Sequence, residues 1–108
     1  MKLNVHIGDY SRQIDVPDYK LAEAKDIFAK IDSDMDQGWQ MSRVWVDELD
    51  AAQRCQVAAD RLLTAIENEN EAMTQLMAGY IMKTMPGIQG IYISVDGDMT
   101  QTEIEMGG

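Results

Sequence analysis

Residues 1–17, "MKLNVHIGDYSRQIDVP", decide the fold because apolar and polar side chains alternate on both sides of a Gly-Asp pair. Such alternation predicts two half-buried β-strands. A two-residue Gly8-Asp9 turn, with glycine first as a type II′ turn prefers, pairs Leu3 with Ile14. The apolar residues then share one face, and Pro17 ends the second strand because it has no N–H to donate.

The other end of the chain repeats this pattern. Residues 90–106, "GIYISVDGDMTQTEIEM", again alternate around glycine and aspartate. A turn at Gly97-Asp98 gathers more apolar residues on one face than a turn at Asp96-Gly97, and a one-residue slip reverses the faces. The favoured register pairs Val95 with Thr100, Ile93 with Thr102, Ile91 with Ile104 and Gln89 with Met106.

The chain between the two hairpins has helical periodicity. Residues 17–38 carry apolar side chains at spacings of three and four, which predicts one amphipathic helix that ends at Gly38. A second helix is expected over residues 47–67, with Asp47 as its N-cap. The apolar positions are Leu21, Ala24, Ile27, Phe28, Ile31 and Met35 in the first helix, and Leu49, Ala52, Cys55, Ala59, Leu62, Leu63 and Ile66 in the second.

Residues 69–85 form either a third helix or a continuation of the second. The apolar stripe can continue through this segment, but Glu67 and Glu71 would repel each other one turn apart. Asn68, with an acid three residues later, is typical of a new N-cap. The pattern therefore favours a break near residues 67–70, and Pro86 ends the last helix.

Together these elements predict an α+β, two-layer fold in a single domain, residues 1–108. The order ββαααββ gives a β-hairpin at each end, joined into a four-stranded antiparallel sheet, with about three central helices packed on one face. The alternative is a long helical hairpin whose ends carry two small sheets that a second copy of the chain completes.

Composition narrows the classes of function. Nineteen Asp and Glu against nine Lys and Arg give a net charge of -10. An acidic surface repels phosphates, which excludes nucleic acid as a partner and suits a protein partner with a basic surface. No apolar run reaches the ~18 residues of a membrane span, so no membrane association is expected. The absence of a signal-peptide pattern and the single cysteine predict a cytoplasmic location.

The stretch "IDSDMDQGWQ", residues 31–40, resembles the start of an EF-hand calcium loop. In that register Gln37 stands where the loop needs glycine, and Arg43 stands where a bidentate glutamate must close the shell. On a helix, Asp32 and Asp36 share one side and Asp34 lies almost opposite. Asp32 and Asp36 are therefore a weak candidate metal site, and a solvated acidic helix end is the competing interpretation.

Residues 39–46, "WQMSRVWV", are the main candidate binding segment. The pattern leaves open whether they form strand, loop or helix. If they are extended, Trp39, Met41 and Trp45 lie on one side with Arg43 among them. Guanidinium packs well on indole, so this surface could bind a ligand or partner, whereas burial of the tryptophans in the core is the competing reading.

No set of catalytic residues stands out. A Cys-His pair would require Cys55, on an apolar helix face, to meet His6 on the polar face of a strand. Motifs for phosphate, zinc and di-iron are missing from the sequence, and no cofactor is expected. Met73, Met77, Met82 and Met85, in or just after the third helix, fit either core packing or an adaptable contact surface.

The sequence favours a small acidic cytosolic protein that acts without catalysis, as an interaction or regulatory module and as a homodimer. A dimer would bury surplus apolar surface through a symmetric patch. The alternative is a ligand-binding module or small enzyme with a pocket for a cationic small molecule or divalent ion near residues 32–45.

Overall fold

The first hairpin forms in the predicted register. In the computed structural model, which describes residues 1–107, β1 (Lys2–Ile7) pairs antiparallel with β2 (Tyr10–Asp15), and Leu3 lies opposite Ile14. Gly8 turns the chain with a φ of 57°, a region that glycine enters without steric conflict. Both Leu3 and Ile14 are buried, so one face of the hairpin belongs to the core.

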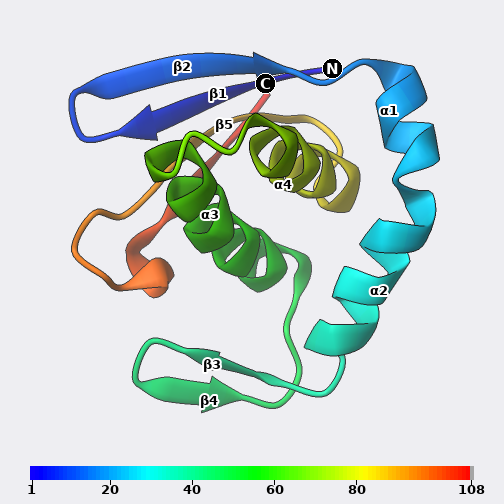
Figure 1. The fold of residues 1–108 in the computed structure, drawn as a ribbon. Coiled ribbons are helices and arrows are strands. Elements are labelled where there is room, and N and C mark those ends of the chain that lie inside the picture. Colours follow the sequence, from blue (N-terminus) through cyan, green and yellow to red (C-terminus); the bar gives the residue numbers. More distant parts are fainter. Residues whose placement is uncertain (108) are drawn as a thin grey trace.

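The main sheet has four strands, but it is mixed rather than antiparallel. Its order is β2-β1-β5-β6, where β5 (Ile88–Tyr92) runs parallel to β1 and β6 (Glu103–Met106) runs antiparallel to β5. The antiparallel prediction is wrong at the central pair. Each hairpin fixes the direction of its own two strands only, whereas the helical connection returns β5 to the end of the sheet where β1 begins (Figure 1).

The second hairpin keeps only part of its predicted register. Ile91 pairs with Ile104 as expected, but Met106 lies opposite Ile88 instead of Gln89. A bulge between Ile88 and Gly90 shifts the pairing by one residue. A bulge leaves one residue unpaired, and alternation alone does not reveal it.

The strands do not continue to the Gly97-Asp98 turn. The predicted pairs of Ile93 with Thr102 and Val95 with Thr100 are wrong, because the chain leaves the ladder after Tyr92 and forms a short 3₁₀-helix, η1 (Met99–Gln101). The Asp98 carboxylate caps η1 by accepting the backbone N–H of Thr100.

Within the described residues, four α-helices connect the hairpins, one more than predicted. They are α1 (Asp18–Glu23), α2 (Lys25–Met35), α3 (Ala51–Glu67) and α4 (Glu71–Thr84). The helix expected over residues 17–38 is interrupted at Ala24, whose ψ of 2° departs from the helical value. Gly38 takes a φ of 92° and ends this helical stretch, as predicted.

The caps of α3 and α4 separate the two helices. The N-cap of α3 is Asp50 rather than Asp47, because Gln53 at the third helical position completes a reciprocal capping box with Asp50. The predicted break near residues 67–70 is confirmed. Asn70, instead of Asn68, caps α4 by accepting the backbone N–H of Met73.

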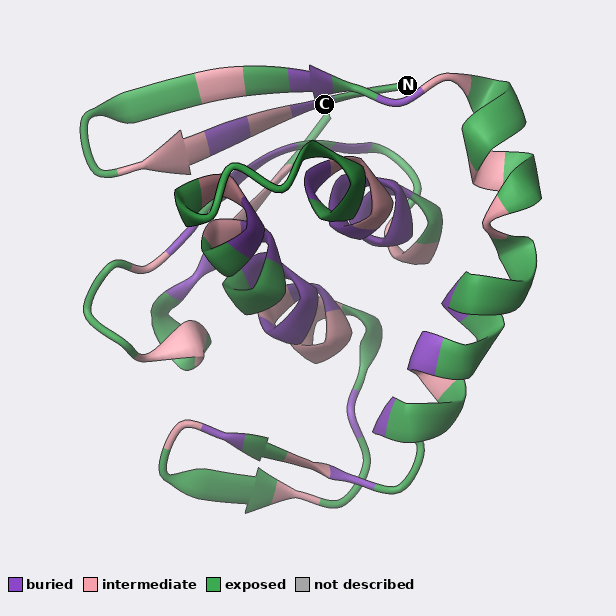
Figure 2. Ribbon diagram, in the orientation of Figure 1, coloured by how far each residue is buried: buried purple, intermediate pink, exposed green. Residues whose placement is uncertain are grey.

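The main core lies between the sheet and two helices. Helices α3 and α4 pack side by side against one face of the sheet, and α1 and α2 flank them (Figure 1). A separate two-stranded sheet lies near the N-terminal end of α3 (Figure 1). Figure 2 shows buried residues along α3 and around most of α4, where all residues from 77 to 82 are buried. None of the helices in residues 1–107 combines the length and apolar character needed to cross a membrane.

Candidate functional site

Residues 39–46 form a hairpin of their own. Strand β3 (Trp39–Met41) pairs antiparallel with β4 (Val44–Val46), and Ser42 and Arg43 form the turn between them. Ser42 has a φ of 57°, which is uncommon for a residue other than glycine. The question of strand, loop or helix is thereby settled in favour of strand.

The hairpin separates the two tryptophans. Trp39 pairs with Val46, and Trp45 pairs with Gln40, so the two indoles lie on opposite faces of the ribbon. The expectation that Trp45 shares a side with Trp39 and Met41 is wrong, because the chain reverses at Ser42 instead of continuing as one strand.

The inward face of this hairpin contributes to the core. Met41 is buried, and Trp39 is half-buried against the core cluster. The arginine over the Trp39 ring is Arg61 of α3, with its guanidinium carbon 5.1 Å from the ring centroid. Arg43 instead lies exposed in the turn. Sequence spacing did not reveal the Trp39–Arg61 contact, because it joins elements that are far apart along the chain.

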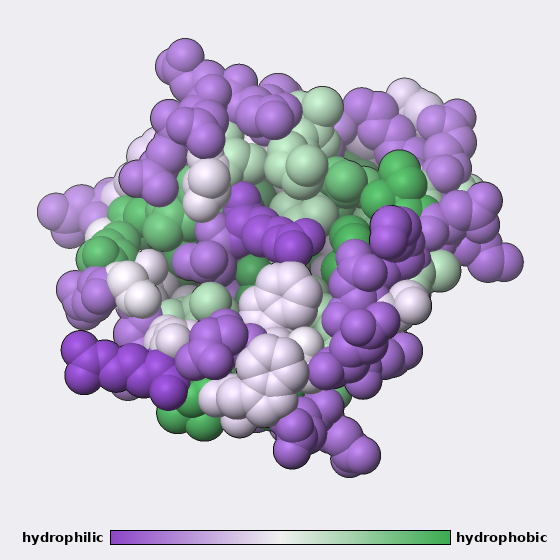
Figure 3. Space-filling view, turned by 60° about the horizontal axis from the view of Figure 1, so that its bottom comes forward, coloured by the Kyte–Doolittle hydropathy of each residue, from purple (hydrophilic) through white to green (hydrophobic). Residues whose placement is uncertain are grey.

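The outward face presents Trp45 to solvent. Its side chain is 55% exposed, and its indole N–H donates to Asp47 Oδ1 at 2.8 Å. The ring lies close over Gly38, so that a side chain at residue 38 would collide with it. Figure 3 looks onto this end of the molecule, where pale aromatic rings lie among hydrophilic side chains.

The acidic end of α2 is a charge-paired junction of three helices. Asp32 and Asp36 lie on one side and both accept from Arg54 of α3, with Oδ1 atoms at 3.2 Å and 2.6 Å from its terminal nitrogens. From α4, Tyr80 donates its hydroxyl to Asp32 Oδ1 at 2.5 Å, and Lys83 contacts Asp32 Oδ2 at 3.0 Å. The helical prediction that places Asp32 with Asp36 is confirmed.

This pairing leaves little capacity for a metal ion at Asp32. A cation there would have to displace Arg54 and Lys83, which already engage both carboxylate oxygens. Across residues 1–107, no group of three or more His, Cys, Asp or Glu side chains is placed to hold a metal ion. Arg54 also donates to the main-chain oxygen of Asp32, so cations offset the negative end of the α2 dipole.

The Asp32 junction predicts a defined pH dependence. Burial alone would raise the pKa of Asp32, but hydrogen bonds from Tyr80, Lys83 and Arg54, and the charge of Lys83, hold it below the ordinary value. A carboxylate whose pKa is lower in the folded protein than in the unfolded chain stabilises the fold at any pH above its pKa in the unfolded chain. This stabilisation is lost as the pH falls through its pKa in the folded protein. The stability advantage of the native protein over Asp32→Asn should therefore shrink below about pH 4. Urea unfolding of both proteins at a series of pH values measures it, and a constant difference down to pH 2 would contradict it.

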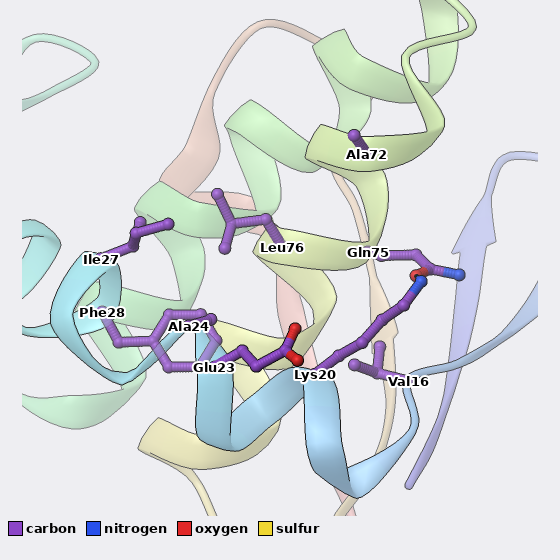
Figure 4. Close-up of a pocket in the computed structure, with 9 residues that line it drawn as sticks. All are labelled: Val16, Lys20, Glu23, Ala24, Ile27, Phe28, Ala72, Gln75 and Leu76. Carbon is purple, nitrogen blue, oxygen red and sulfur yellow. Dashed lines mark hydrogen bonds between the residues drawn. The ribbon is translucent and has the colours of Figure 1, made fainter.

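An apolar groove on the helical side was missed by the sequence analysis. Two adjoining hollows of about 370 and 390 Å³ lie between α1–α2 and α4, and both are lined by Ile27 and Leu76. In Figure 4 these two side chains point toward each other across the hollow, and Phe28 lies beside them. Lys20 reaches over to Gln75, with 2.7 Å between Nζ and Oε1.

The exposed residues of the groove had a weak sequence signal. Ile27 belongs to the apolar stripe of residues 17–38, yet its side chain is 50% exposed, and Met73 is 38% exposed. Met77 and Met82 are buried in the core. The methionines of α4 are therefore divided between the core and the surface, and the packing of neighbouring helices decides which of them solvent reaches.

Comparison of the chain with protein-family models found no matching family. Comparisons with curated proteins and with solved structures likewise found no match.

Proposed function

We propose that the protein is a non-catalytic interaction module that acts as a homodimer, with two copies meeting at the apolar groove between α2 and α4. The observation that carries this proposal is an open apolar groove. The charged side chains that line it sum to zero, whereas the whole chain has a net charge of -10.

The apolar part of the groove supplies the driving force. Ile27 and Met73 are large apolar side chains that solvent reaches, and they lie on opposite sides of one hollow. Burying a fully exposed side chain of this kind contributes about 1.5–3 kcal/mol, and roughly half of that or less remains available at these partly exposed residues. In a symmetric dimer each contact occurs twice, so a few exposed side chains contribute substantially.

The charges around the groove select the occupant. Two strongly acidic copies repel each other over most of their surfaces. The groove lining holds equal numbers of both signs, so a second copy meets complementary charge there and a basic partner gains no advantage. The three basic residues are Lys20, Lys30 and Arg61, and the three acidic residues are Glu23, Asp26 and Asp34.

The placement of the reactive side chains supports a function without catalysis. Cys55 is fully buried, and this burial raises the pKa of its thiol to about 12. His6 lies on the polar face of the sheet, stacked on Tyr92 with ring centroids 4.4 Å apart. The sheet therefore stands between the thiol and the imidazole, and thiolate chemistry at neutral pH is disfavoured.

A charge placed in the groove tests the proposal. Ile27→Lys puts a lysine next to its copy across a two-fold axis, and we expect self-association to weaken by about tenfold or more. Val95→Lys is the matched control, because Val95 is 60% exposed and lies outside the groove. Light scattering after gel filtration, over micromolar concentrations, measures the mass of each variant.

Two results would contradict the proposal: a wild-type chain that stays monomeric at every concentration, or an Ile27→Lys variant that associates as strongly as Val95→Lys. Both positions are at least half exposed, so neither substitution buries a charge in the monomer. Circular dichroism on the same samples verifies that the fold is retained.

A second candidate function is small-ligand binding near residues 32–45. The specific observation that favours it is a polar hollow of about 490 Å³ at the tip of the β3–β4 hairpin, lined by Arg43 among others. Asp32 and Asp36 do not line that hollow, so the cation pocket expected from the sequence divides into two separate regions.

A further inference from the structure

The polar hollow lies between two segments that are distant in sequence. One wall is the turn of the β3–β4 hairpin, which contributes Ser42 and Arg43, and the other is the loop after β5, which contributes Asp96 and Asp98. The hollow shares no residue with the apolar groove. Its chemistry can therefore be tested independently of dimer formation.

Hydrogen bonds hold the two walls together. Ser42 donates its hydroxyl to Asp98 Oδ1 at 2.8 Å, and its Oγ accepts the backbone N–H of Met99 at 3.2 Å. The hydroxyl of Thr100 also donates to Asp98, at 2.6 Å. These hydrogen bonds from Thr100 and Ser42 lower the pKa of Asp98, so this carboxylate stays ionised as a fixed part of the wall.

Three charged side chains line the hollow, and Asp98 is already engaged by Ser42 and Thr100. This leaves Arg43 and Asp96 as the two opposite charges open to a ligand. Arg43 and Asp96 both line it and both are exposed. Within residues 1–107, neither side chain forms an ion pair. A guanidinium and a carboxylate separated across one hollow match a molecule that carries a carboxylate and an ammonium group.

We propose that this hollow binds a small zwitterion of the α-amino acid class. The carboxylate of the ligand accepts from the Arg43 guanidinium, and its ammonium group donates to the Asp96 carboxylate. Val44, which is 60% exposed at the same hollow, offers apolar contact to the rest of the ligand. Small ligands typically bind where a few polar groups converge in a hollow of this size.

The test is a titration of small molecules into the protein, in which two-dimensional NMR spectra monitor the backbone amide signals. The probes are L-alanine, L-leucine and two half-ligands, acetate and methylammonium, each at millimolar concentration. We expect the amino acids to shift the amide signals of residues 42–44 and 96–100, and each half-ligand to bind about tenfold or more weakly, because it lacks one of the two charge contacts.

Substitutions separate the two contacts. Arg43→Gln should weaken amino-acid binding by about tenfold or more, and Asp96→Asn should abolish the preference for alanine over acetate. The matched control is Lys25→Gln, which removes one positive charge from an exposed position outside the hollow. The spectra themselves report whether each variant remains folded.

Three results would overturn the proposal. One is an absence of shifts in residues 42–44 and 96–100 with either amino acid. Another is equal binding of acetate and alanine by the native protein, which would define an anion site. The third is an Arg43→Gln variant that binds as well as Lys25→Gln. Repeating the titration on Ile27→Lys distinguishes this hollow from the dimer, because the proposed binding persists in a monomer.

Discussion

Replacing Asp32 by alanine is expected to lower the free energy of unfolding by about 2–3 kcal/mol. The carboxylate accepts from side chains of two other helices, and its removal leaves the hydroxyl of Tyr80 without that acceptor in the core. Removing one partner from a fully buried pair is more damaging, but Asp32 retains 30% side-chain exposure, so solvent screens part of the loss.

The control for this prediction is two residues further along α2. Asp34→Ala removes an equivalent carboxylate on an exposed face, and its one ion pair among residues 1–107 is with Lys30, at 3.4 Å. An exposed pair one helical turn apart contributes about 0.3–0.5 kcal/mol. Urea denaturation of the two variants gives the comparison. Equal destabilisation would mean that the three-helix junction does not stabilise the fold as described.

The substitution Gly38→Ala is expected to lower the free energy of unfolding by about 2–4 kcal/mol. Gly38 has a φ of 92°, which an L-residue enters only with strain. An added Cβ would also lie 2.7 Å from the Trp45 ring and 2.9 Å from the main-chain oxygen of Val46. The ring can move, but the oxygen belongs to the β4 backbone, so the hairpin itself must shift.

Gly97→Ala is the control, because it introduces the backbone strain of a positive φ without a steric collision. Gly97 also has a positive φ, 78°, but a Cβ there would meet nothing within 4 Å. This variant should therefore lose only the conformational component, about 1–2 kcal/mol. Thermal unfolding followed by circular dichroism measures both variants, and tryptophan fluorescence reports whether Trp45 moves in Gly38→Ala. A smaller loss at Gly38 than at Gly97 would contradict the close packing of Trp45 on Gly38.

Local features of the fold could be predicted from the sequence. The register of the first hairpin follows from alternation and the Gly8 turn, which act over a few residues. The break between α3 and α4 follows from local charge and capping preferences. Features that depend on distant partners could not be predicted in this way, including the parallel pairing of β1 with β5 and the bulge near Gly90.

The candidate sites likewise combine local features, which the sequence predicts, with contacts between distant residues, which it does not. Helical geometry places Asp32 with Asp36, but it does not reveal Arg54, Tyr80 and Lys83, which reach Asp32 from elsewhere in the chain. Within residues 39–46, the alternation leaves strand, loop and helix open, and it does not reveal the reversal at Ser42, whose hydroxyl donates to Asp98 from a distant part of the chain. The grooves and hollows arise only when helices and loops pack, so their position follows from tertiary structure.

Sedimentation equilibrium of the wild-type chain tests the homodimer most directly. The chain has a mass of 12.1 kDa, and the account predicts that the weight-average mass rises toward twice that value as the protein concentration increases through the micromolar range. Because salt screens the repulsion between two acidic copies, higher ionic strength should favour the dimer. A mass that stays at 12.1 kDa at all concentrations and salt conditions would contradict the central claim.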